Sequence, residues 1–76
     1  MESKWAELKL RAEQACEQNE YEESEQLWWL ALREAEDAQN VQMLCMCLDG
    51  LAEVFIKQSR YAEAESLYRE SLGKKA

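Results

Sequence analysis

Proline and histidine are missing from this 76-residue chain, and glycine occurs only twice. With no proline and abundant Ala, Glu, Leu and Gln, nothing interrupts a helix strongly, because these side chains lose little rotamer freedom in a helix. No segment alternates apolar and polar residues with a period of two, which is the pattern of a half-buried strand. We therefore expect an all-α protein.

The absence of histidine also removes the commonest general base. No serine lies in a nucleophile-elbow motif and no glycine lies in a phosphate-binding loop. The neighbouring carboxylates of Glu22, Glu23 and Glu25 lie on a polar helix face, where solvated carboxylates have no catalytic task. We expect no enzyme activity and no cofactor.

Cysteine is scarce, with three residues, and the odd number argues against a disulfide framework. Cys45 and Cys47 are two residues apart on a helix, so their side chains diverge by about 200° and do not chelate one ion. Cys packs well as a small apolar residue. We expect Cys16, Cys45 and Cys47 to be free and buried, and we expect no metal site.

Positive charge is scarce as well, since nine Lys and Arg residues leave a net charge of −7. This argues against a nucleic-acid partner, because affinity for phosphate backbones depends on cationic side chains. No apolar run approaches the roughly 20 residues that cross a bilayer, and the charged start is no secretory signal. We expect a cytoplasmic protein. Its acidic surface either serves solubility or attracts a basic or amphipathic protein or peptide.

An internal repeat is the most informative feature that the chain does have. A shift of forty residues superposes residues 19–32 on residues 59–72, with small side chains on small and aromatic on aromatic. The matched pairs include Tyr21 with Tyr61, Glu25 with Glu65, Leu27 with Leu67, Trp28 with Tyr68 and Leu32 with Leu72. Such a period indicates one supersecondary unit that is copied along the chain and is too small to bury its own apolar face.

The apolar spacing predicts four helices in this repeat. We expect Asn19 and Ser59 to be N-caps, with Glu22 closing a capping box, and Gly73 to end the last helix in a left-handed conformation. Asn40 is the only plausible break between the second and third helices. Helices joined by short turns lie antiparallel. The sequence thus predicts one domain over 1–76, with two stacked helical hairpins at about 4–38 and 41–74, in which the long period lengthens the second helix and the loop after it.

The segment from Met43 to Leu48, MLCMCL, has two interpretations. It either fills the core between the hairpins or forms an adaptable apolar patch, and we favour the core because helices in the middle of a stack are buried. Trp29 follows an inward-facing Trp28, so it needs an apolar partner of its own or remains exposed.

The residues resemble a tetratricopeptide repeat (TPR) protein, whose unit is a two-helix hairpin with spaced large and small residues. The second copy carries the pattern in Leu48, Leu51, Ala52, Phe55, Tyr61, Ala64 and Tyr68. The first copy is looser, because Arg11 and Ala15 stand where large apolar residues are usual. Units of this long period are similar to those of kinesin light chains and their bacterial relatives.

The resemblance implies a non-catalytic scaffold that binds peptides or proteins in a concave groove lined by the first helix of each hairpin. The implied groove residues are Ala6, Lys9, Leu10, Glu13, Cys16, Met46, Asp49, Gly50, Glu53 and Lys57. Within this set we expect Lys9, Glu13, Met46, Asp49 and Glu53 to determine specificity. The three carboxylates would repel a ligand that carries a C-terminal carboxylate.

Stacked repeats need about three units or a capping helix and only two are present, so we expect a partner protein, a larger parent chain or a second copy of the chain to cover the surplus apolar surface. An alternative function is therefore a self-assembly element. Two chains would then form a homodimer through Trp29, Met43, Met46 and Cys47. If the AEDAQN linker stays helical, the second and third helices fuse and the hairpins exchange between chains.

Overall fold

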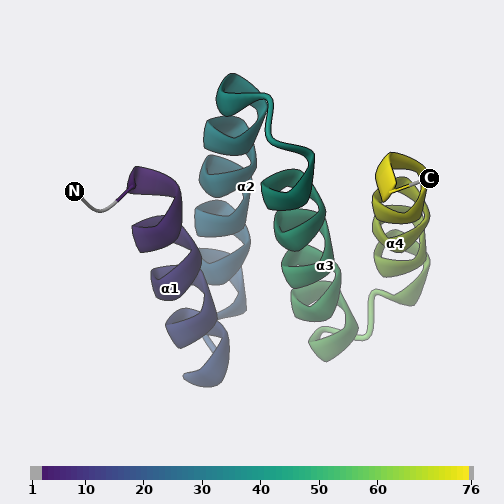
Figure 1. The fold of residues 1–76 in the computed structure, drawn as a ribbon. Helices are drawn as coiled ribbons and strands as arrows, with labels where there is room; N and C mark the ends of the chain where they lie inside the picture. Colours follow the sequence, from purple (N-terminus) through teal and green to yellow (C-terminus); the bar gives the residue numbers. More distant parts are fainter. Residues whose placement is uncertain (1–2, 76) are drawn as a thin grey trace.

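Four α-helices make up the fold, and their order along the chain is also their order in space. The computed structural model describes residues 3–75 and contains α1 (Lys4–Glu17), α2 (Tyr21–Ala38), α3 (Val41–Lys57) and α4 (Tyr61–Lys75). Neighbouring helices are antiparallel, with α1 and α4 at the two ends of the array (Figure 1). No strand occurs within residues 3–75, which confirms the expected all-α fold.

The hairpins α1–α2 and α3–α4 pack on each other through α2 and α3. The Cα atoms span 33 × 29 × 13 Å, so the array is a thin layer. In a layer of this thickness only α2 and α3 have a helix on either side, and α1 and α4 each leave one flank uncovered.

The turn between α1 and α2 differs from the sequence prediction. Asn19 has a left-handed backbone with φ 64°, and its N–H donates to the Cys16 carbonyl at 3.0 Å. The Glu20 N–H donates to the Ala15 carbonyl at 2.8 Å, which completes a Schellman motif. The predicted N-cap at Asn19 and its capping box with Glu22 are therefore wrong. Glu20 holds the N-cap position and its side chain makes no capping bond.

The second hairpin repeats this turn. Ser59 has φ 62° and its N–H donates to the Ile56 carbonyl at 2.9 Å, while the Arg60 N–H donates to the Phe55 carbonyl at 2.8 Å. Ser59 thus ends α3 and does not cap α4, contrary to the prediction. The predicted left-handed end at Gly73 is also wrong, because α4 continues through it and no glycine has a positive φ.

The break between the hairpins lies at the predicted residue, Asn40. The Asn40 Oδ1 atom accepts a hydrogen bond from the Met43 N–H at 3.0 Å, and the preceding Gln39 ends α2 with φ 52°. Only Gln39 and Asn40 separate the helices, so the extra length of the repeat lies in the helices and the expected longer loop is absent. The fused helix of the domain-swap alternative is not adopted here.

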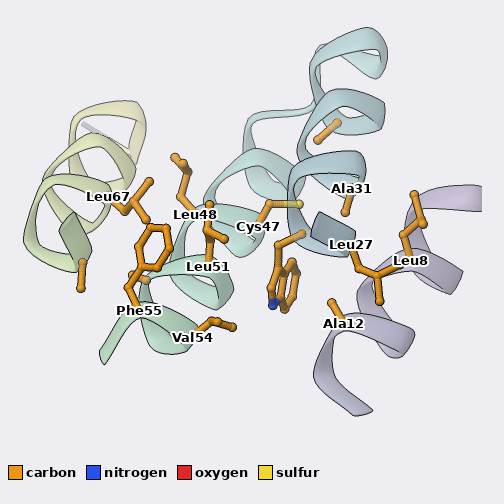
Figure 2. Close-up of a cluster of buried hydrophobic side chains, with 14 of the residues drawn as sticks. Leu8, Ala12, Leu27, Ala31, Cys47, Leu48, Leu51, Val54, Phe55 and Leu67 are labelled. Atoms are coloured by element: carbon orange, nitrogen blue, oxygen red, sulfur yellow. The ribbon is translucent and has the colours of Figure 1, made fainter. Parts of the chain in front are cut away.

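Small side chains set the helix spacing in the core. Ala12, Ala31, Ala35 and Ala52 are completely buried, and α3 provides the larger side chains between its neighbours. Figure 2 shows Cys47 directed toward α2 and Phe55 directed toward Leu67 on α4. The MLCMCL segment is mainly core, as expected: Cys45, Cys47 and Leu48 are buried, Met43 and Leu44 are half-buried, and Met46 is exposed.

Polar contacts also join the two hairpins. The Trp5 indole N–H donates to the Cys47 sulfur at 3.0 Å, which links α1 to α3. The Arg60 guanidinium pairs with Glu25 of α2 at 3.2 Å and lies 4.2 Å from the centre of the Phe55 ring. Arg60 therefore connects the start of α4 to both α2 and α3.

Candidate functional site

A groove with a volume of about 1030 Å³ runs across α1 and α3 and reaches the end of α4. All five residues expected to determine specificity line it: Lys9, Glu13, Met46, Asp49 and Glu53. Leu10, Cys16, Gly50 and Lys57 line it as well, so only Ala6 of the implied set does not. The structure thus brings together five specificity residues from both repeats, of which Lys9 and Glu53 are 44 positions apart in the sequence.

Several lining residues were missed by the sequence prediction. They are Gln14, Glu17, Asn19, Trp28, Val54, Tyr68, Ser71 and Leu72. Those of α4 matter most, because Tyr68 and Leu72 add exposed apolar surface to the α4 end of the groove. The forty-residue match places Tyr68 on Trp28 and Leu72 on Leu32, neither of which was expected in the groove, so it gave no signal for them. A smaller hollow of about 460 Å³ shares Met46 and Asp49 with the groove.

The lining is amphipathic and acidic. Leu10, Met46 and Leu72 are exposed apolar side chains. Among the charged lining residues, the carboxylates of Glu13, Glu17, Asp49 and Glu53 outnumber the ammonium groups of Lys9 and Lys57. One ammonium is engaged locally, because the Lys9 Nζ atom donates to Glu13 at 3.0 Å. The groove therefore combines apolar contact area with an excess of negative charge.

Cys16 is the one thiol that lines the groove, and its chemistry is suppressed. Burial raises the pKa of this thiol, Lys57 lowers it and Glu53 raises it further. A raised pKa keeps the sulfur protonated at neutral pH, and the thiol is a poor nucleophile in that form. Cys16 acts as a small apolar side chain between α1 and α3.

The residues expected at a dimer interface are dispersed. Trp29 is 45% exposed on α2 and does not line the groove, whereas Met46 is exposed inside it. Met43 is half-buried against the core. Cys47 is buried, and this burial raises the pKa of its thiol although the hydrogen bond from Trp5 lowers it. Cys47 thus offers no surface to a second chain in this fold.

Residues 3–75 contain neither a cluster of metal ligands nor a helix that could span a membrane. No group of three or more His, Cys, Asp or Glu side chains in residues 3–75 is placed to hold a metal ion. None of the four helices, taken over the same residues, has the length and apolar character needed to cross a membrane.

Comparison with protein-family models, with curated proteins and with solved structures gives no match for this chain. The groove, with its excess of negative charge and its exposed apolar side chains, is the candidate binding site of this chain.

Proposed function

We propose that this chain is a non-catalytic interaction scaffold of the TPR type that binds a basic, amphipathic helix or peptide in its groove. One observation carries the proposal: Lys9, Glu13, Met46, Asp49 and Glu53, taken from both repeats, line a single groove of about 1030 Å³. In a helix-in-groove site, side chains from separate elements line one continuous groove that receives the apolar face of an amphipathic helix.

The chemistry of the lining supports a ligand with one apolar and one cationic face. Leu10 and Leu72 come from the first and last helices, so apolar contacts are available at both ends of the groove. Between them, Glu13, Asp49 and Glu53 favour Lys or Arg on the ligand and disfavour carboxylates. Cationic side chains with long apolar stems satisfy both requirements.

A scaffold without catalysis is favoured by the groups that the groove contains. The chain has no histidine, and the Cys16 thiol is held in its protonated form. The cytoplasm is the compartment we propose, because the three cysteines are free thiols and reducing compartments keep thiols in that state.

The test uses synthetic peptides of about 18 residues, which is five helical turns, with Leu on one face and Lys on the other. Binding of a labelled peptide is followed by fluorescence anisotropy, with a Leu/Glu peptide of the same pattern as the negative control. We expect the Leu/Lys peptide alone to bind, and the combined variant Glu13→Lys, Asp49→Lys and Glu53→Lys to abolish this binding.

A matched variant separates the groove from net charge. Glu22→Lys, Glu36→Lys and Glu70→Lys reverse the same number of charges at exposed positions outside the groove. We expect this variant to keep at least about half of the affinity. Equal weakening by both triple variants would show that the peptide responds to overall charge, and the groove assignment would then fail.

Self-assembly is a second candidate, and an exposed pair on α2 favours it. Trp29 and Leu30 are adjacent and expose 45% and 49% of their surfaces. Contiguous exposed apolar surface marks interaction sites on soluble proteins. Light scattering across a concentration series tests this candidate: a dimer that Trp29→Glu converts to a monomer supports it, and a monomer at every concentration removes it.

A further inference from the structure

One stripe of residues recurs on α2 and α4 in very different surroundings. On α2 it consists of Tyr21, Glu25, Trp28 and Leu32, and on α4 of Tyr61, Glu65, Tyr68 and Leu72. The spacing of four, three and four residues places each set on a single helix face. We call the second set the outer stripe of α4.

The stripe on α2 is the surface that holds the second hairpin. Trp28 packs directly on Gly50 of α3 and is only 3% exposed. Tyr21 and Leu32 pack against the core, and Glu25 pairs with Arg60 at 3.2 Å. Each member of this set is thus at least partly covered in the fold.

The outer stripe of α4 has the same residue types without the same cover. Tyr68 is 38% exposed, Tyr61 is 63% exposed and Leu72 is 65% exposed. Among the residues that the structure describes, the ion pair of Glu65 lies within its own helix, with Arg69 at 2.5 Å. Within residues 3–75, α3 is the only helix that packs on α4, and the stripe lies on a different face.

We propose that the outer stripe of α4 docks an α-helix with the chemistry of α3, supplied by a partner protein. The interface between α2 and α3 is the template, so the required helix presents an apolar side like the one that α3 turns toward α2. It carries a small residue opposite Tyr68, as Gly50 lies opposite Trp28, and a cation that reaches Glu65, as Arg60 reaches Glu25. This surface goes beyond the groove, because Tyr61 and Glu65 do not line it.

A second copy of the chain does not supply this helix through its own α1. The forty-residue shift places Leu10 where the template has Gly50, so a branched side chain replaces the small residue that the template places against an aromatic ring. The shift also places Glu20 where the template has Arg60, opposite the carboxylate of Glu65. Three apolar residues that are buried on α3 correspond to exposed polar residues on α1. The pairs are Cys47 with Glu7, Leu51 with Arg11 and Val54 with Gln14.

The probe is a labelled synthetic peptide of residues 41–60, kept reduced, which contains the α3 helix and Arg60. It is titrated with the full chain and followed by fluorescence anisotropy. We expect saturable binding that Leu72→Lys in the protein weakens by about tenfold or more, the effect of replacing a buried apolar contact by a charge. The matched variant Leu30→Lys changes another exposed leucine, 49% exposed and outside the stripe, and should leave the affinity within about twofold.

Variants of the peptide test the geometry of the template. Gly50→Val should abolish binding, whereas Ala52→Val, on the opposite side of the same helix, should not. Circular dichroism of each protein variant confirms that the fold is intact. The combined variant Glu13→Lys, Asp49→Lys and Glu53→Lys, which is expected to abolish binding in the groove, should leave the affinity for this peptide unchanged, and this separates the two proposals although Leu72 lines the groove as well.

Three results would overturn the proposal. The first is no binding, or binding that Leu72→Lys leaves unchanged, as would occur if the peptide replaced the chain's own α3. The second is a peptide that tolerates Gly50→Val. The third is a dimer in light scattering that Leu72→Lys converts to a monomer, because the stripe would then be occupied by a second copy.

Discussion

Gly50 of α3 lies against the ring of Trp28 of α2 so closely that no other residue fits there. A Cβ atom at Gly50 would overlap the Cζ2 atom of Trp28 and lie 2.6 Å from its Cε2 atom. Trp28 is buried and does not have a flexible end that could move aside. This contact therefore determines how closely the two hairpins approach.

Substitution of Gly50 by Ala should destabilise the protein by about 1–3 kcal/mol, the usual effect of overpacking a filled core. Unfolding in urea, followed by circular dichroism, measures this effect. Gly73 is the control, because nothing lies within 4 Å of a Cβ atom at that helical position. Gly73→Ala should stabilise the protein by roughly 0.5–1 kcal/mol. Equal effects at both glycines would contradict the close approach of α2 and α3.

Ser59→Gly should stabilise the protein by about 1 kcal/mol, because Ser59 holds a left-handed backbone that glycine adopts without strain. If Ser59 were the N-cap of α4, the same change would cost a few tenths of a kcal/mol. The sign of the change in unfolding free energy thus decides between the two descriptions of the turn. Ser66→Gly, at an exposed position inside α4, should destabilise the protein.

The carboxyl group of Glu63 should titrate below its ordinary pKa of about 4.5, because it accepts a hydrogen bond from Arg60. A lowered pKa in the folded state means that the stabilisation is present above about pH 4.5 and is lost as the pH falls through the folded-state pKa. Arg60→Gln should therefore raise the pKa of Glu63, as seen by NMR titration. It should also destabilise the protein more at pH 7 than at pH 3.

Arg69→Gln is the matched control for this titration, since Arg69 pairs with Glu65 at an exposed site within α4. It should leave the pKa of Glu63 unchanged. A Glu63 pKa that does not respond to Arg60→Gln would show that the guanidinium is not its main partner.

The three thiols should react in a fixed order with a maleimide at pH 7. Cys16 is half-buried and should react slowly, whereas Cys45 and Cys47 are buried and should react only after unfolding. Burial favours the neutral thiol and so raises the pKa of Cys16 and Cys47. The folded state therefore keeps its full stability below about pH 9 and loses stability as the pH rises through the folded-state pKa of these thiols. Mass spectrometry of the labelled sites measures the order. Rapid labelling of Cys47 would contradict its place in the core.

Labelling of Cys16 also probes the groove. A maleimide adduct at this position would occupy the space between α1 and α3, so it should block binding of the Leu/Lys peptide. An adduct that leaves this binding intact would place the peptide elsewhere.

The groove could be predicted to a large extent from the sequence. The repeat places Lys9 and Asp49 at equivalent positions, and equivalent faces of stacked hairpins form one surface. The prediction missed Tyr68 and Leu72, because they belong to the second helix of their hairpin and become accessible only where no further helix covers them. The burial of Cys47 could not be predicted either. The third helix has apolar residues on two sides, and the sequence does not say which side faces α2.

The sequence by itself determined four helices, their antiparallel pairing, the break at Asn40 and the repeat that aligns two equivalent faces. These features follow from local spacing and helix propensity, which act within a few residues. Only the tertiary structure decided that Asn19 and Ser59 end helices instead of starting them, and that Gly50 accommodates Trp28. The physical reason is that a turn of three residues takes the backbone angles that let its two helices pack, and packing also decides which of several apolar faces is buried.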